Sequence, residues 1–93
     1  MRFEWDEFKA RSNLRNHGVT FSEAEKVFDD PNAIVGFDEA HSQQEERQWL
    51  LGMSPRRRVL LIVFTERTEA MVRLISARKA TWEEFKLYEE EKK

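Results

Sequence analysis

The feature that most constrains the fold of this chain is a run of six consecutive apolar residues, Val59 to Phe64. Side chains of a strand point alternately to its two faces, so a strand that is apolar at every position must be covered on both. The run therefore predicts a central β-strand, covered on both faces by the chain itself or on one face by a partner. It is far too short to span a bilayer.

Other segments with the periodicity of strands surround this run, and all of them follow Pro31. The expected strands cover residues 33–37, 47–53, 59–65 and 71–77. Gly52, Ser54 and Pro55 indicate one turn, and residues 66–68 indicate the next. This spacing predicts a meander-like antiparallel sheet.

The period of two also predicts which residues share a face in the two strands that flank the central one. One face consists of Arg47, Trp49, Leu51 and Met53, and the other of Met71, Arg73, Ile75 and Ala77. Each strand thus carries one arginine on a mostly apolar face. Arg78 has the opposite parity to Arg73, so we expect the strand to end or bulge near Ala77 and let Arg78 turn toward the same side.

Two short helices are expected before Pro31. Asp6 is a typical N-cap residue, and the first helix should run to about Asn16, where Gly18 supplies the left-handed residue that ends it. The second helix is indicated by a capping box of Thr20 and Glu23 at its start and by the break Asp30-Pro31 at its end.

A third helix is expected after the strands, where Thr81 and Glu84 form a second capping box. The predicted fold class is therefore α+β, with two N-terminal helices, a four-stranded and mainly antiparallel sheet, and a C-terminal helix. At 93 residues the chain is too short for a second independent core, so one domain is expected over residues 1–93.

Composition excludes several classes of chemistry. The sequence has no cysteine, which rules out disulfides and a thiolate nucleophile, and it contains no P-loop and no Gly-rich dinucleotide turn. His17 and His41 lack the spacing of a helical metal-ligand pair, so neither a metal nor another cofactor is expected. No secretion signal or membrane segment precedes the fold, which favours a cytoplasmic protein with no membrane partner.

Charge is distributed unevenly along the chain. The net charge is −2, but residues 47–79 carry eight basic and two acidic side chains, so this segment is +6 and the remainder −8. Seven of the eight cations are arginines, whose planar donors suit phosphate oxygens. The pattern is typical of a basic face that meets phosphates or an acidic partner, although solvated strand ends would have the same composition.

The residues that could perform chemistry suit the cleavage of RNA by its own 2′-OH. That reaction needs a base for the 2′ proton, cations for the phosphorane, and an acid for the leaving oxygen. The candidate cations are Arg47, Arg67, Arg73 and Arg78, and the candidate acids and bases are His41, Glu45, Glu46, His17 and Lys9. The arginines also have a structural interpretation, because arginines in strands commonly form ion pairs or extend along the surface so that the charged end reaches solvent.

The sequence resembles the BrnT family of ribonuclease toxins over nearly its whole length. The matching motifs are His17-Gly18-Val19, Asp30-Pro31, Glu45-Glu46-Arg47, Glu66-Arg67 and Ile75-Ser76-Ala77-Arg78, together with Trp5-Asp6, His41 and Arg73. The resemblance implies a RelE-like fold and a toxin that cleaves RNA and thereby inhibits translation. It implies functional roles for His41, Glu45, Arg47, Arg67, Arg73 and Arg78.

The resemblance also implies a partner, an antitoxin of the BrnA type with a ribbon-helix-helix domain, through which the chain would reach DNA only indirectly. An alternative is a binding module that has lost turnover and acts as a corepressor with that partner. A homodimer is also left open, because Trp49, Trp82 and Tyr88 would suit an interface as well as a core.

Overall fold

Strand β4 (Val59–Thr68) lies at the centre of a five-stranded sheet in the computed structural model, which describes residues 1–41 and 46–92. The strand order is β1-β5-β4-β3-β2. The other strands are β1 (Arg2–Glu4), β2 (Ile34–Phe37), β3 (Gln48–Met53) and β5 (Met71–Lys79). The prediction of a central strand is confirmed.

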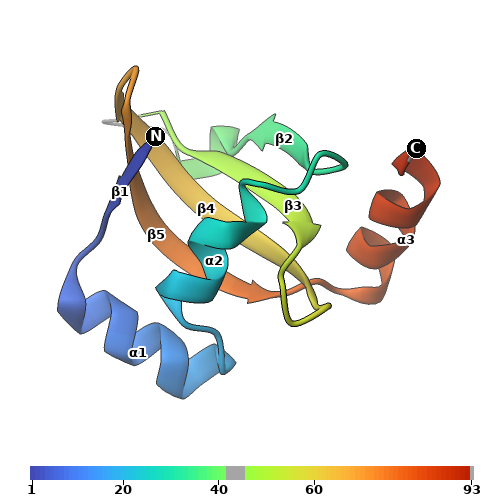
Figure 1. The fold of residues 1–93 in the computed structure, drawn as a ribbon, viewed down its shortest axis with the longest axis horizontal. Helices are drawn as coiled ribbons and strands as arrows, with labels where there is room; N and C mark the ends of the chain where they lie inside the picture. Colours follow the sequence, from blue (N-terminus) through green and yellow to red (C-terminus); the bar gives the residue numbers. More distant parts are fainter. Residues whose placement is uncertain (42–45, 93) are drawn as a thin grey trace.

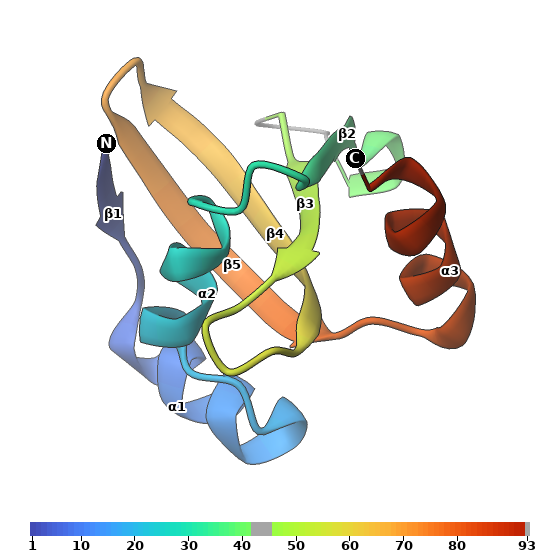
Figure 2. The same ribbon diagram turned by 45° about the vertical axis from the view of Figure 1, so that its right-hand side comes forward.

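The two faces of β4 contact different parts of the chain. Leu60, Ile62 and Phe64 point to the side covered by α1 (Glu7–His17) and α2 (Phe21–Val27), which we call the inner face. Val59 and Leu61 point to the opposite side, the outer face, where α3 (Trp82–Glu91) packs against one end of the sheet. Figures 1 and 2 show α3 set apart from the other two helices. Among residues 1–41 and 46–92, the outer face is therefore covered by a helix at one end only.

The three predicted helices are confirmed, whereas the prediction of four strands is wrong by one. Strand β1 pairs in parallel with β5, with Arg2 opposite Met71 and Glu4 opposite Arg73. Its three residues are too few for an alternating pattern to stand out, and its partner lies 69 residues further along the chain. Every other pairing among the described strands is antiparallel, as expected.

The second turn of the meander also lies later than predicted. Residues 66–68 belong to β4, and the turn consists of Glu69 and Ala70. The first turn is confirmed near Ser54, whose amide donates to the carbonyl of Arg58 at 2.9 Å. This end of β4 is exposed, so its residues are charged or polar and lack the apolar alternation of a buried strand. For this reason the sequence pattern predicted a turn there.

A bulge in β5 changes which of its side chains share a face. The register with β4 shifts between the pairs Val63–Ser76 and Phe64–Leu74, so Ile75 is an extra residue. Ala77 consequently lies in the core of the inner face, and its predicted place on the face of Met71 and Arg73 is wrong. The expected bulge is present two residues before Ala77, and the strand continues to Lys79.

The helix signals are confirmed in α1 and partly corrected in α2. Asp6 caps α1 by accepting from the amides of Phe8 and Lys9, and Gly18 ends it at φ 69°. Thr20 caps α2 by accepting from the amide of Glu23 at 3.0 Å, but the Glu23 carboxylate does not return to Thr20. It accepts instead from the Ser54 hydroxyl at 2.6 Å and from Arg58, so it joins α2 to the turn between β3 and β4.

Asp30, in the segment that follows α2, connects α3 to the end of β3. Its carboxylate accepts from the amide of Met53 at 2.8 Å, the hydroxyl of Tyr88 at 2.6 Å and the amide of Asn32 at 2.9 Å. Burial opposes ionisation, but these three hydrogen bonds together hold the pKa of Asp30 below its usual value. Asp30, three residues after the end of α2, thus anchors the last helix.

The buried amide of Asn13 completes the outer edge of β5. Beyond β1 no strand of the described residues neighbours that edge, and Asn13 occupies it with a pair of hydrogen bonds typical of a strand. Its Nδ2 donates to the carbonyl of Ala77 at 2.7 Å, and its Oδ1 accepts from the amide of Ala77 at 3.0 Å. Nδ2 also donates to the carbonyl of Val19 at 2.9 Å. One side chain thus connects α1, the start of α2 and the bulged part of β5.

We predict that Asn13→Ala lowers the free energy of unfolding by about 3 kcal/mol, because it leaves buried groups of Ala77 and Val19 without partners. Urea unfolding measures the loss. Asn16→Ala, on the exposed side of the same helix, is the matched control and should cost about 0.5 kcal/mol or less. Equal losses in the two variants would contradict a structural role for the Asn13 amide.

Candidate functional site

Two arginines of β5 lie on the outer face. Arg73 is opposite Thr65 of β4 and Glu4 of β1, and Arg78 is opposite Leu61 of β4. Without the bulge at Ile75 they would point to opposite sides, because Arg78 is five positions after Arg73 and strand side chains alternate with a period of two. The bulge therefore creates a face with two guanidinium groups.

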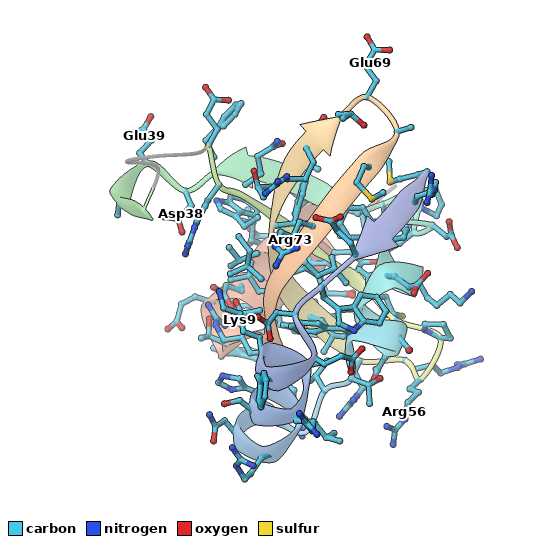
Figure 3. All side chains as sticks on the ribbon, turned by 90° about the vertical axis from the view of Figure 1, so that its left-hand side faces the viewer. Lys9, Asp38, Glu39, Arg56, Glu69 and Arg73 are labelled. Atoms are coloured by element: carbon cyan, nitrogen blue, oxygen red, sulfur yellow. The ribbon has the colours of Figure 1, made fainter. Side chains whose placement is uncertain are left out.

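Arg73 forms an ion pair with Glu4, and its side chain remains open to solvent. Its Nη1 donates to Oε2 of Glu4 at 2.9 Å, and 36% of the Arg73 side chain is exposed. Figure 3 shows the Arg73 side chain beside β5, well away from Arg56. Since one of the five N–H donors of the guanidinium contacts Glu4, the others can contact an anion.

Arg78 is held more firmly, by both oxygens of Glu84 at the start of α3. Nη1 donates to Oε1 at 2.8 Å and Nη2 to Oε2 at 2.9 Å, while Nη1 also donates to the carbonyl of Lys79 at 3.1 Å. The hydrogen bonds from Arg78 hold the pKa of Glu84 below its usual value, and those same bonds raise the pKa of Arg78. Glu84 also accepts from the amide of Thr81 and so completes the predicted capping box.

Arg47 and Trp49 bring β3 into the same region. The carbonyl of Arg47 accepts from the amide of Asp38 at 2.8 Å, which extends the ladder between β2 and β3 by one residue. Alternation along the chain then places the half-buried Arg47 on the outer face with Trp49. Arg47, Arg73 and Arg78 therefore lie on the same face of the sheet.

Arg67 lies elsewhere, at the exposed end of β4. It lines a hollow of about 560 Å³ together with Phe37, Glu46, Gln48, Thr65 and Glu66. Within this hollow, Nε2 of Gln48 donates to Oε1 of Glu66 at 2.9 Å. Thr65 is opposite Arg73, so the hollow borders the strand position that faces Arg73.

The predicted acids and bases are placed less completely. His41 is the last residue of the short 3-10 helix η1 (Glu39–His41), which follows β2. Glu45 lies outside the described residues. Glu46 lines the hollow beside Arg67, whereas Lys9 and His17 belong to α1. The structure thus groups three of the four candidate arginines and leaves the proton-transfer groups unassigned.

Arg58 of the basic turn has a structural role. It binds the carboxylate of Glu23, donates to the carbonyl of Gly18 at 3.1 Å, and has a side chain that is 21% exposed.

Glu4 and Glu84, the ion-pair partners of Arg73 and Arg78, were not predicted as site residues. Glu84 could be found in sequence only as a helix cap, because its contact with Arg78 depends on how the chain bends after β5.

In the described part of the chain, no three histidine, aspartate or glutamate side chains lie close enough together to hold a metal ion. None of the helices in residues 1–41 and 46–92 has the length and apolarity needed to cross a bilayer. The chemistry available on the outer face is that of the Arg73 and Arg78 guanidinium groups, whose remaining N–H donors suit phosphate oxygens.

Comparison with known proteins identifies relatives of this chain. Residues 5–84 match a family model described as the ribonuclease toxin BrnT of a type II toxin–antitoxin system. The 1.1 Å crystal structure of the Brucella abortus ribonuclease toxin BrnT has a similar fold, with a TM-score of 0.67 and 23% identity over 87% of this chain and 97% of that one. No curated protein sequence matches at a significant level.

The ion pair of Arg78 and Glu84 predicts a dependence of stability on pH. Because the pKa of Glu84 lies below 4.5 in the folded chain, its stabilisation is complete above that pH and is lost as the pH falls through the lowered value. We predict that Glu84→Gln destabilises the chain near neutral pH and that its difference from wild type shrinks between about pH 5 and about pH 3 in urea unfolding.

The control for this pH series is Glu89→Gln, which removes a carboxylate from a more exposed position of the same helix. Its difference from wild type should be small at every pH. A destabilisation by Glu84→Gln that is the same at neutral and acid pH would show that the charge of Glu84 contributes nothing.

Proposed function

The chain belongs to the BrnT family of ribonuclease toxins of type II toxin–antitoxin systems, and on this basis we propose that it is an endoribonuclease that cleaves RNA without a metal ion. The observation that supports this most is the presence of Arg73 and Arg78 on one face of the sheet. Together with Arg47 they would supply the positive charge that a metal supplies in other nucleases. The proposed enzyme occupies residues 1–93 as one unit with a RelE-like fold.

In the proposed reaction, the 2′-OH of one nucleotide attacks the adjacent phosphorus. A base takes the 2′ proton, the new bond from the 2′ oxygen to phosphorus forms, and the bond to the 5′ oxygen of the next nucleotide breaks. An acid gives a proton to that 5′ oxygen. The products are a 2′,3′-cyclic phosphate and a 5′-hydroxyl, and no cofactor is consumed.

The arginines are proposed to bind the phosphorane as its charge develops. Their carboxylate partners support this role, because Glu4 and Glu84 restrict the two guanidinium planes and still leave N–H donors for phosphate. A restrained donor needs little reorganisation when the transition state forms. Arg78, with three donor contacts within the chain, has fewer donors left than Arg73.

For proton transfer we retain His41 and Glu45 as candidates. Both precede Arg47 closely in the chain, and His41 is the last residue of η1, which follows β2. Arg67 is proposed to bind a neighbouring phosphate from the hollow that it shares with Glu46. The proposed functional set is therefore His41, Glu45, Arg47, Arg67, Arg73 and Arg78.

The proposed partners are RNA, whose cleavage inhibits translation in the cytoplasm, and a BrnA-type antitoxin with a ribbon-helix-helix domain. The alternative is a module without turnover that represses its operon together with the antitoxin. The same two ion pairs also suit that alternative, because Glu4 and Glu84 each neutralise the charge of one guanidinium, that of Arg73 or of Arg78. Cleavage assays on the purified chain separate the two functions.

We predict that RNA cleavage persists in excess EDTA and that the products carry 2′,3′-cyclic phosphate ends. Attack by the substrate's own 2′-OH needs no metal-bound water, so chelation should leave the rate unchanged. Gel analysis of labelled RNA with and without EDTA, followed by phosphatase treatment of the ends, measures both. Loss of cleavage in EDTA that a divalent ion restores would contradict the mechanism.

We predict that Arg73→Ala and Arg78→Ala each lower the cleavage rate by a factor on the order of 10², the scale for single donors at a developing charge. The chain should stay folded, because each side chain lies at the surface. Arg57→Ala, in the exposed turn, is the control and should keep the wild-type rate. A wild-type rate in both outer-face variants, or a collapse of their melting temperatures, would remove these arginines from the mechanism.

A further inference from the structure

Trp49 occupies the middle of the outer face, on the row of residues between the two arginines. It is opposite Val63 of β4, which in turn is opposite Ser76 of β5. Arg78 lies beyond Ser76 in one direction along β5 and Arg73 in the other. Two strand spacings separate Trp49 from Ser76, which corresponds to roughly 10 Å.

The absence of a side chain at Gly36 allows the indole to cover β2. A Cβ atom at Gly36 would lie 2.3 Å from Cζ2, 2.5 Å from Cε2 and 3.0 Å from Cη2 of Trp49. Three adjacent ring atoms at such distances mean that the ring lies with its face over the glycine. Gly36 therefore fixes the plane of the indole along the sheet.

The indole also borders an apolar hollow of about 290 Å³ between the sheet and α3. The other residues that line it are Leu51, Leu61, Glu84 and Leu87. Its volume is at the lower end of the range for small-ligand pockets. Glu84, its acidic member, is paired with Arg78, so the side of the hollow nearest β5 carries little net negative charge.

We propose that the indole of Trp49 is a stacking platform for one base of single-stranded RNA, an inference that rests on the proposed ribonuclease function. An apolar ring fixed between guanidinium groups matches a nucleotide, whose flat base is flanked by phosphates. A base within a duplex cannot expose its face, so the ligand is unpaired RNA. A protein segment would use the apolar hollow but not the arginines on both sides, and for this reason RNA is favoured.

The test uses a variant in which Trp49 is the only tryptophan, made by Trp5→Phe and Trp82→Phe. The probe is a short single-stranded 2′-O-methyl oligonucleotide, which lacks the attacking hydroxyl and stays intact. We expect saturable quenching of Trp49 fluorescence on titration. In the wild-type background, Trp49→Leu should weaken oligonucleotide binding by about 5- to 150-fold, the range for one stacked base, while Trp49→Phe should retain most of it.

Trp82→Leu is the matched control, because Trp82 is 67% exposed, belongs to α3 and stacks on Phe85 of the same helix. Its affinity should equal that of wild type. Urea unfolding of each variant confirms that it is folded. Gly36→Ala, which displaces the ring, should weaken binding in the same direction as Trp49→Leu.

The proposal is overturned if the oligonucleotide binds without changing Trp49 fluorescence, or if Trp49→Leu binds as tightly as wild type. It is also overturned if Trp49 responds to the antitoxin protein and not to the oligonucleotide, since the surface is then a protein contact. Cleavage of unmodified RNA is measured on the same samples. Cleavage without quenching rejects the platform alone, whereas absence of both cleavage and binding rejects the proposed function as well.

Discussion

The pairing of the Asn13 amide with the backbone of Ala77 is the interaction on which the rest of this structure depends. A strand edge that is buried under a helix must find partners for its amide and carbonyl groups, and β1 is too short to provide them along the whole of β5. Asn13 provides both from a helix. It thereby holds β5 immediately after the bulge, at the point that decides the face on which Arg78 lies.

The outer face combines residues that enter it from different parts of the chain. Glu4 comes from the first strand, Trp49 from the third, Arg73 and Arg78 from the fifth, and Glu84 from the last helix. Each ion pair connects a strand of the sheet to a neighbouring element and at the same time orients a guanidinium. Binding and stability therefore use the same contacts, and a change at Glu4 or Glu84 affects both.

Local signals in the sequence predicted the elements well, and contacts between distant segments were the part that they could not predict. The N-cap at Asp6, the left-handed Gly18, the capping box at Thr81 and the central strand all depend on neighbours within a few residues. Strand β1, the use of Glu23 by Arg58 and the partner of Arg78 depend on how segments far apart in the chain come together. The face on which Arg78 lies was predicted from a different kind of signal. In a regular strand Arg73 and Arg78 would point to opposite faces, and a bulge or strand end was expected to bring them to the same face.

The parallel pairing of β1 with β5 has a consequence for the order of events during synthesis. Strand β1 is synthesised before β5, and its partner residues are 69 positions further along the chain, so the two strands cannot meet until β5 has been translated. Until then Glu4 has no arginine beside it, and α1 has no strand edge on which to place Asn13. A nascent or prematurely terminated polypeptide therefore lacks the assembled outer face, and only translation through β5 completes it.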